Sequence, residues 1–139
     1  MTAILVDAGP IVALFDASEA NHARCREALA TADGPLVTCE GVLAEACWLL
    51  RRFPGARRDL LLDVVDRRYV VDYRLADRAD AVARLMSKYS SVPMSLADAC
   101  LVDLAGEMQS GRILTLDADF HVYRWGRNQA FELLLNPKR

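Results

Sequence analysis

Four acidic residues, spread along almost the whole chain, carry the strongest chemical signal in this sequence. They stand where apolar segments end or within short apolar helices, and they are Asp7, Glu45, Asp98 and Asp117. A carboxylate is costly to place among apolar neighbours unless something pairs with it. Hard divalent cations do this well, because they prefer oxygen ligands. The pattern therefore predicts a metal-dependent enzyme of phosphate chemistry.

Each of these acids also has an ordinary structural explanation. Asp7 precedes Gly9-Pro10 and could cap a helix, and Ser95 with Asp98 three residues later forms a capping-box pattern. Asp117 and Asp119 follow an apolar segment in which Thr115 adds a hydroxyl, and aspartates favour turns there. Four acids in one site explain more than four separate caps, because the sequence offers no rival nucleophile.

Glu45 is the most informative of the four. It lies three residues after Val42 and four before Leu49, so we expect it on the apolar face of its helix or at the edge of that face. A carboxylate aimed toward the core needs a partner, which is either a metal ion or a buried arginine. We favour the metal. Asp103 lies one residue off the helical stripe through Asp98 and is expected at the surface.

The elements that must position these acids alternate between strand-like and helix-like segments. The expected strands are Ala3–Val6, Leu36–Thr38, Tyr69–Tyr73, Ile113–Leu116 and Phe131–Leu134. The expected helices run from Gly9 to about Phe15, over Asn21–Ala32, from a Thr38 cap to about Arg52, and over Ala56–Arg67, Ala76–Tyr89 and Leu96–Met108. This order predicts an α/β fold with a mainly parallel sheet of four to five strands. Ligands bind beyond the carboxyl ends of such strands, where Asp7 and Asp117 lie.

Composition limits the alternatives. The chain has 139 residues, of which 53% are hydrophobic and 26% charged, so we expect one globular domain over residues 1–139. No apolar run approaches membrane-spanning length and no secretory signal opens the chain, so we expect a cytoplasmic protein without membrane contact. The four cysteines show no paired spacing, which favours free thiols over a zinc site or disulfides.

The positive charge is nearly all arginine, with lysine only at positions 88 and 138. Arginine binds phosphate well because its planar guanidinium donates two parallel hydrogen bonds. The candidate phosphate contacts are Arg51, Arg52, Arg57 and Arg58, with His22 as a weaker candidate. For any single arginine pair, a solvated helix surface is the simpler explanation. The net charge of −2 gives no global sign of nucleic-acid binding.

With these motifs in place, the chain resembles the PIN-domain ribonucleases of the VapC-like toxin family. The resemblance rests on the opening from Leu5 to Asp16, on Val42-Leu43-Ala44-Glu45, on Ser95-Leu96-Ala97-Asp98-Ala99 and on the segment from Leu114 to Phe120. Each motif is short, whereas their order and spacing together are rather specific. Family members often carry a small hydroxyl residue after the first aspartate, and here that residue is Ala8.

The resemblance implies a compact three-layer α/β/α domain and a ribonuclease that depends on one or two Mg²⁺ or Mn²⁺ ions. It implies that Asp7, Glu45, Asp98 and Asp117 are the catalytic, metal-binding acids, with Asp119, Thr115 and Ser95 as auxiliary groups. It also implies an RNA substrate, usually a homodimer, and, for a toxin, a small antitoxin partner. A free-standing RNA-processing nuclease of the same fold would look much the same.

Three other functions fit less well. A receiver domain needs a well-placed lysine and an acid pair after the first strand, and a haloacid-dehalogenase-like phosphatase needs Asp-x-Asp there; Asp7-Ala8-Gly9 offers neither. A non-catalytic module of the same fold would be expected to have lost one or more of the acids, and all four remain.

The sequence also predicts an interaction surface. The residues of Leu60-Leu61-Leu62 cannot all face one direction on a helix, so at least one should stay outside the core. The tryptophans and tyrosines are expected in the core or at a dimer contact rather than as base-stacking platforms. Exposed apolar patches usually mark interfaces, which favours a homodimer or an antitoxin groove.

Overall fold

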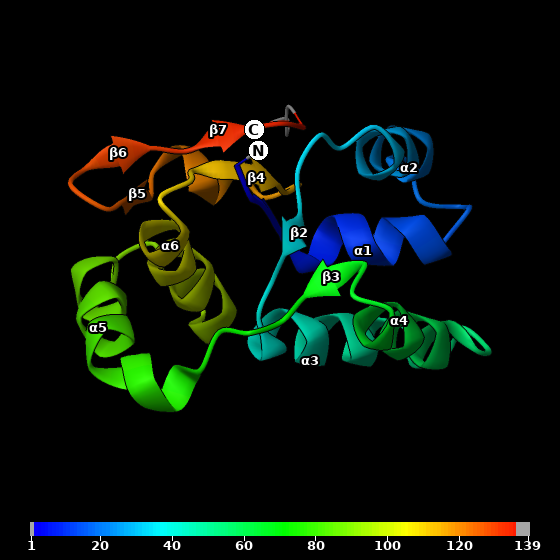
Figure 1. Ribbon diagram of the computed structural model, residues 1–139, viewed down its shortest axis with the longest axis horizontal. Coiled ribbons are helices and arrows are strands. Elements are labelled where there is room, and N and C mark those ends of the chain that lie inside the picture. Colours follow the sequence, from blue (N-terminus) through cyan, green and yellow to red (C-terminus); the bar gives the residue numbers. More distant parts are fainter. Residues whose placement is uncertain (1, 136–139) are drawn as a thin grey trace.

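A computed structural model describes residues 2–135 and shows a five-stranded, fully parallel sheet (Figure 1). The strand order is β3-β2-β1-β4-β7, so the first strand lies at the centre. The strands are β1 (Ile4–Val6), β2 (Leu36–Val37), β3 (Tyr69–Val70), β4 (Arg112–Leu114) and β7 (Glu132–Leu133). The α/β class, the parallel sheet and the number of strands are those expected from the sequence.

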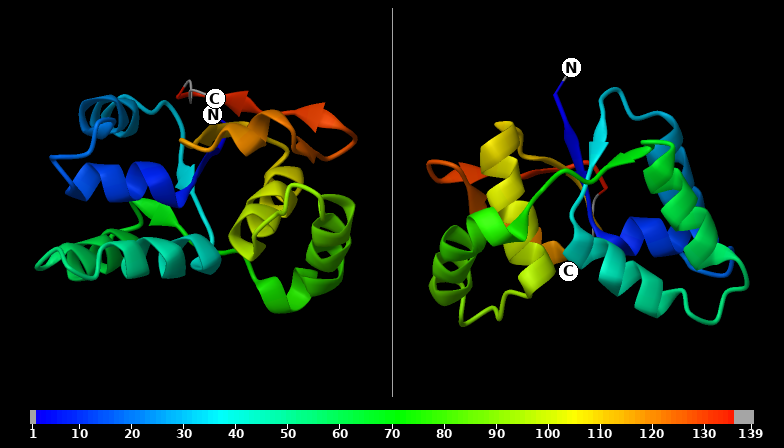
Figure 2. Two further views of the ribbon diagram at one scale, coloured as in Figure 1. Left: turned by 180° about the vertical axis from the view of Figure 1, so that it is seen from behind. Right: turned by 60° about the horizontal axis from the view of Figure 1, so that its bottom comes forward.

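Six α-helices in this part of the chain cover the sheet. They are α1 (Ala8–Phe15), α2 (His22–Ala30), α3 (Glu40–Leu49), α4 (Ala56–Val65), α5 (Leu75–Lys88) and α6 (Leu96–Met108). Helices α1 to α4 form one group and α5 and α6 form another, and both views of Figure 2 show strands lying between the two groups. This is the three-layer arrangement that a parallel sheet requires, because each face of the sheet must be covered.

The central strand explains why the sheet forms here. Ile4, Leu5 and Val6 are each at most 1% exposed, so β1 is buried on both faces. Leu5 pairs with Val37 of β2 on one side and with Ile113 of β4 on the other. A continuous apolar run of this length is what a central parallel strand needs. The pairing also aligns the carboxyl ends of β1 and β4, which is where the site lies.

Two local features differ from the expectation. Thr38 does not cap α3: its hydroxyl donates to the carbonyl of Val6 at 2.7 Å, and Cys39 is the N-cap residue. Thr38 is fully buried beside the end of β1, so its hydroxyl bonds across the sheet instead. The 3₁₀ helix η1 (Ala118–His121) and the hairpin of β5 (Arg124–Trp125) and β6 (Gln129–Ala130) are also absent from the elements expected from the sequence.

The aromatic side chains divide between core and surface. The four tyrosines are at most 9% exposed, which confirms their expected place in the core, whereas Trp48 is 65% exposed and lies outside it. All four cysteines are free thiols, and three of them are buried. Over residues 2–135, the structure has no helix that is long and apolar enough to cross a membrane.

Candidate metal centre

Three of the four acids meet at one point. One carboxylate oxygen from each of Asp7, Asp98 and Asp117 lies within 4.8 Å of the other two. Asp7 follows β1, Asp117 follows β4 after two residues, and Asp98 lies in the first turn of α6. The segments that carry them are more than ninety residues apart in the case of Asp7 and Asp98. The fold therefore assembles the cluster from both ends of the chain.

Strand pairing brings Asp7 and Asp117 together. Val6 and Leu114 are partners in the adjacent parallel strands β1 and β4, and the backbone N–H of Asp7 donates to the Leu114 carbonyl at 3.0 Å. Parallel strands that are in register end at the same edge of the sheet. The residues that follow them must therefore share one site.

Asp7 is the most enclosed of the three acids, at 7% exposed. Its carboxylate accepts hydrogen bonds from the Ala8 backbone N–H and from the Thr115 hydroxyl, both at 2.8 Å. Burial raises the pKa of Asp7; these two hydrogen bonds oppose the rise, and the nearby charges of Glu45 and Asp117 add to it. The expected cap of α1 is real, but the second carboxylate oxygen is turned to Thr115 and the cluster.

Asp98 combines a capping position with a place in the cluster. The Ser95 hydroxyl accepts from the Asp98 backbone N–H at 3.0 Å, which confirms Ser95 as the N-cap of α6. The Asp98 carboxylate accepts from the Tyr123 hydroxyl at 3.1 Å. Burial, followed by the negative charge of Asp7, raises the pKa of Asp98 from 3.8 to about 6.

Asp117 is held by its own local turn. Its backbone N–H donates to the Thr115 hydroxyl at 3.0 Å, and its carboxylate accepts from the Asp119 backbone N–H at 2.9 Å. Asp117 thereby caps η1. Thr115 is fully buried and joins two acids, since it donates to Asp7 and accepts from the Asp117 backbone. The Asp119 carboxylate is not part of the three-oxygen cluster.

Glu45 lies at the margin of the cluster rather than in the core, so of the two expected positions it takes the edge of the apolar face and not the face itself. The buried residues of α3 are Val42, Leu43 and Ala46, and the stripe that they share with buried Leu50 lies about a third of a turn from Glu45. The glutamate is exposed. Partial burial, then the charges of Asp98 and Asp117, raise its pKa. Within residues 2–135, Glu45 therefore has other acids rather than an arginine as its charged neighbours.

Close packing of α3 on α6 brings Glu45 this near. A β-carbon on Gly41 would lie 3.4 Å from the Ala97 Cα, so the two helix backbones approach where glycine leaves room. Gly41 is one turn before Glu45, and Ala97 is the neighbour of Asp98. The backbones of α3 and α6 are therefore in close contact beside Glu45 and Asp98.

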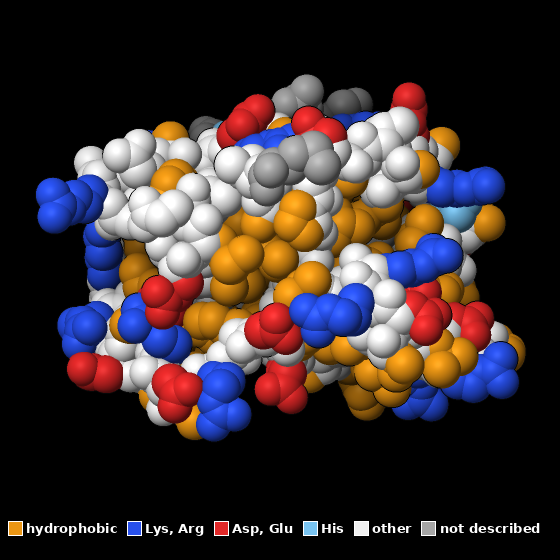
Figure 3. Space-filling view, viewed as in Figure 1, with side chains coloured by type: hydrophobic (Ala, Val, Ile, Leu, Met, Phe, Trp, Pro, Cys, Tyr) orange, Lys and Arg blue, Asp and Glu red, His pale blue; other side chains and the backbone are white. Residues whose placement is uncertain are grey.

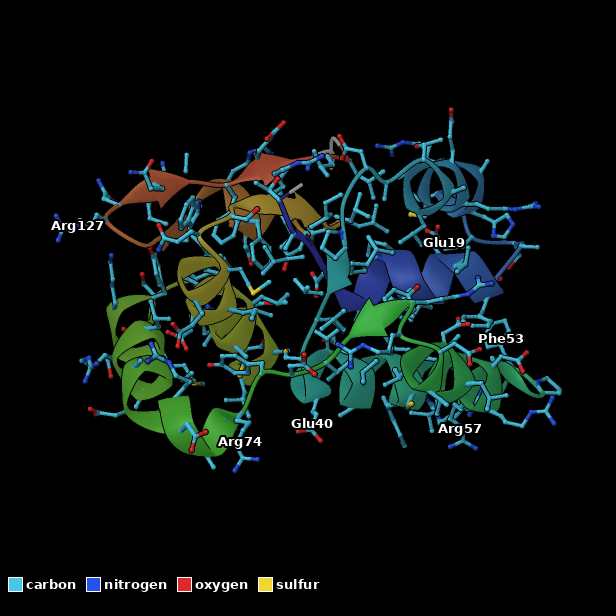
Figure 4. The ribbon with its side chains drawn as sticks, in the orientation of Figure 1. Glu19, Glu40, Phe53, Arg57, Arg74 and Arg127 are labelled. Carbon is cyan, nitrogen blue, oxygen red and sulfur yellow. The ribbon has the colours of Figure 1, made fainter. Side chains whose placement is uncertain are left out.

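The candidate phosphate contacts do not join the cluster in this chain. Arg51 and Arg52 follow the end of α3, and Arg57 and Arg58 lie in the first turn of α4, so all four sit at the end of α3 away from Cys39. The Arg57 side chain points outward from this end (Figure 4). The His22 ring nitrogen Nδ1 lies 2.7 Å from the Ala13 carbonyl, which ties α2 to α1.

The cluster has no cation of its own among the described residues. The ion pairs between arginines and acids in residues 2–135 involve none of its three members. Three close carboxylates without a counter-charge repel one another. Oxygen ligands of this kind suit a hard divalent cation. The donor set therefore fits a metal ion.

The family assignment follows from a match to the PIN domain model over residues 4–126, which includes all four acids. The chain belongs to the PIN domain family. A curated relative of this PIN domain, ribonuclease VapC26 of Mycobacterium tuberculosis, is 29% identical over 116 residues, covering 82% of this chain and 86% of the relative.

A solved structure shares the fold of this PIN domain. The crystal structure of Mycobacterium tuberculosis VapC20, a Sarcin-Ricin loop cleaving toxin, matches with a TM-score of 0.78 and 22% identity. The match covers 86% of this chain and 93% of the VapC20 chain. At this level of identity the likeness establishes the three-layer fold.

One residue beside this site of the PIN domain has no signal in the sequence that connects it to the acids. Tyr123, expected only as a core or dimer aromatic, donates its hydroxyl to Asp98. The two residues are 25 positions apart in different elements, so no periodicity or local motif connects them. Only the position of the segment after η1 in the folded chain reveals the contact.

Proposed function

We propose that this PIN domain protein is a metal-dependent endoribonuclease that hydrolyses RNA phosphodiester bonds, and that it is the toxin of a toxin–antitoxin pair. The observation that carries the proposal is the cluster of Asp7, Asp98 and Asp117 at the carboxyl edge of the sheet, whose carboxylates lie close together and form no ion pair with an arginine or lysine of residues 2–135. The names of its relatives, a ribonuclease and an RNA-cleaving toxin, support the substrate class.

In this proposal Asp7, Asp98 and Asp117 bind Mg²⁺ or Mn²⁺, and Glu45 acts from the solvent side. A bound ion would supply Lewis-acid chemistry: it would lower the pKa of a bound water, so that the water loses a proton and the resulting hydroxide can attack phosphorus, and it would neutralise charge on the leaving oxygen. The exposed Glu45 carboxylate is available to orient that water, because it forms no ion pair within residues 2–135. No residue of the chain needs to form a covalent intermediate.

The auxiliary residues have positioning roles. Thr115 holds Asp7 through its hydroxyl and the start of η1 through the Asp117 backbone. Ser95 caps α6 and thereby fixes the turn that carries Asp98. Asp119 orients Asp117 through its backbone N–H rather than through its carboxylate.

Cleavage of a synthetic RNA with and without metal tests the proposal. We expect activity with Mg²⁺ or Mn²⁺, none in EDTA, and a steep loss as salt rises, because phosphate contacts dominate affinity for nucleic acid. The double variant Asp7→Asn/Asp98→Asn should stay folded, lose cleavage and lose the rise in melting temperature that Mn²⁺ gives the wild type. Robust cleavage in EDTA, or a double variant whose melting temperature still rises with Mn²⁺ as in the wild type, would show that the acids do not share a metal site.

A histidine variant is the matched control for the chemistry. His22 bonds to the Ala13 backbone, away from the acids, so His22→Ala should lower stability modestly and leave cleavage in metal intact. A strong loss of cleavage in a folded His22→Ala variant would mean that His22 transfers a proton in the reaction, which contradicts its purely structural role in the proposal.

We further propose that the protein is a homodimer through the apolar surface of α3 and α4. This surface consists of Trp48, Leu49, Leu61, Leu62 and Val65, each at least 45% exposed. Leu60 is fully buried, which confirms that the three consecutive leucines divide between core and surface. Figure 3 shows apolar side chains gathered over α4 with Lys and Arg side chains at the margin. Apolar patches of this kind mark interfaces.

Sedimentation equilibrium at micromolar concentration tests this assembly. We expect a dimer mass for the wild type and a monomer mass for Leu61→Glu. Met108→Glu, which changes an exposed apolar residue outside the surface, should leave the dimer intact. A wild-type monomer that forms a defined complex only with an antitoxin would reject the dimer and assign the surface to that partner.

A further inference from the structure

Tyr123 reaches the metal centre from the core. Its side chain is fully buried, and its hydroxyl lies 3.1 Å from the Asp98 carboxylate oxygen Oδ2. A buried phenol needs a hydrogen-bond partner, and here the partner is an acid of the cluster. Burial, followed by the charge of Asp98, raises the pKa of Tyr123. In this contact the hydroxyl is the donor and the Asp98 carboxylate is the acceptor.

The position of the Tyr123 hydroxyl is fixed by aromatic packing. The Tyr123 ring makes edge-to-face contacts with Tyr89 at 5.1 Å and with Phe120 at 5.0 Å between ring centres. Phe120 in turn packs edge-to-face on Phe131 at 5.4 Å. The Tyr123 backbone N–H also donates to the Asp119 carbonyl at 3.1 Å. The ring cannot shift without disturbing this group.

Each acid of the cluster has such a donor. Asp7 has the Thr115 hydroxyl and Asp117 has the Asp119 backbone N–H, both from the segment after β4. Asp98 receives its donor, Tyr123, from that same segment. Ser95 also acts on the Asp98 side chain, but from the N-cap position of the helix that carries Asp98. The hydrogen bond from Tyr123 thus connects Asp98, which lies on helix α6, to the segment after β4 that also bonds to Asp7 and Asp117.

We propose that Tyr123 is a positioning residue that holds the Asp98 carboxylate toward Asp7 and Asp117, so that the three form one metal site. This inference rests on the proposed function. Hydrogen bonds to ionised groups are roughly twice as strong as neutral ones. The loss of an outer hydrogen-bond partner of a metal-binding group typically weakens metal affinity by about 10- to 100-fold.

Mn²⁺ binding tests the role without relying on activity. Tyr123→Phe removes one oxygen and keeps the ring, so the aromatic contacts persist. Free Mn²⁺ in titrations, measured by electron paramagnetic resonance, should show a dissociation constant about tenfold higher than that of the wild type. The matched control is Tyr89→Phe. The Tyr89 hydroxyl accepts from the Arg124 backbone N–H and has no hydrogen bond to an acid in the part of the chain that the structure describes, so this variant should lose stability but bind Mn²⁺ as the wild type does.

The outcomes separate this inference from the proposed function. A wild type that binds no Mn²⁺ would reject the metal centre itself. A wild type that binds Mn²⁺, together with a Tyr123→Phe variant of equal affinity, would overturn the role of Tyr123 and leave the function standing. Equal weakening in both phenylalanine variants would mean general loosening of the aromatic group and would also overturn it. Should Tyr123→Phe fail to fold, a ring-fluorinated tyrosine can replace Tyr123, because its hydroxyl is a stronger hydrogen-bond donor. The protein with this replacement should bind Mn²⁺ more tightly than the wild type, and unchanged binding would reject the proposal.

Discussion

Two aspartates on helix α6, five residues apart, have opposite surroundings. Asp98 meets two further carboxylates, and its pKa is raised to about 6 by burial and by the charge of Asp7. Asp103 meets a cation: the Arg78 guanidinium donates two hydrogen bonds to it at 2.9 Å each, and the Tyr73 hydroxyl donates a third at 2.8 Å. Burial raises the pKa of Asp103, but these hydrogen bonds outweigh it and leave the pKa below its ordinary value.

The difference shows that burial alone does not mark a metal site. Both aspartates are partly buried and each accepts a hydrogen bond from a tyrosine. What separates them is the charge balance: Asp103 forms an ion pair with Arg78, whereas the ion pairs within residues 2–135 do not include Asp98. A carboxylate cluster without a cation has room for an external one, whereas an aspartate clamped by arginine does not. Asp103 was expected at the surface, and the ion pair with α5 is what draws it inward.

The largest expected effect comes from removing each charge in turn. Asp98→Asn should reduce RNA cleavage by more than about a hundredfold. Loss of a group that only hydrogen-bonds to a metal ligand costs up to about a hundredfold, and this variant removes a proposed ligand itself. Its melting temperature without metal should not fall, since one of three repelling charges is gone. Asp103→Asn should keep Mn²⁺ binding and cleavage but lower the melting temperature, on the order of 5 °C. Cleavage assays and thermal melts of both variants measure the contrast. An Asp103→Asn variant that neither cleaves RNA nor binds Mn²⁺ would contradict it.

A smaller effect is a pH dependence of opposite sign at the two aspartates. The raised pKa of Asp98 means that its contribution to stability is complete below 3.8 and is lost as pH rises through about 6. The lowered pKa of Asp103 means the reverse: its contribution is present above 3.8 and is lost as pH falls through its folded pKa. Metal-free melts should therefore show stability declining between pH 3.8 and about 6.

Two variants check the assignment of this pH dependence. Asp98→Asn should flatten the decline toward about pH 6, and Asp103→Asn should flatten the loss at lower pH. Mn²⁺ should stabilise the wild type more as pH rises, because binding needs the ionised carboxylate. A decline that persists unchanged in Asp98→Asn would assign it to another group.

The smallest expected effect is at Glu45, which shares charged neighbours with the cluster but stays exposed. Glu45→Gln should weaken Mn²⁺ binding only a few-fold, because charges near solvent interact weakly, while cleavage falls further if Glu45 orients the water. Glu40→Gln, an exposed change in the first turn of the same helix, is the control and should alter neither. A Mn²⁺ affinity that collapses in Glu45→Gln would place Glu45 among the ligands instead.

The sequence predicts the fold class well, because the signals are local and strong. The apolar run of β1 and the Ser95-capped helix α6 are found where expected, and α6 has its expected bounds of Leu96–Met108. The aspartates that follow strands meet as expected, because parallel strands end together. The two-residue strands β2, β3 and β7 lie within expected strands, whereas the hairpin of β5 and β6 after η1 is not expected from the sequence, since two-residue ladders leave no periodicity to detect.

The remaining features depend on long-range contacts. The orientation of Glu45 depends on which residues of α3 meet the core, and three apolar residues on each side leave this open. Tyr123 and Asp98, like Arg78 and Asp103, are joined across 25 residues by packing that no short motif encodes. The sequence pattern and the family resemblance both predict the acids; the structure adds the groups that form hydrogen bonds with them.

The hydrogen bond from Thr115 to Asp7 joins residues 108 positions apart. Because β1 and β4 must pair before the acids can meet, a chain that is still being synthesised has no site until residue 117 has left the ribosome and folded back. The site therefore forms only when synthesis of the domain is almost complete. A cell that makes this nuclease handles an inert polypeptide for most of its synthesis, and the ability to cut RNA arises only with the last segment of the site.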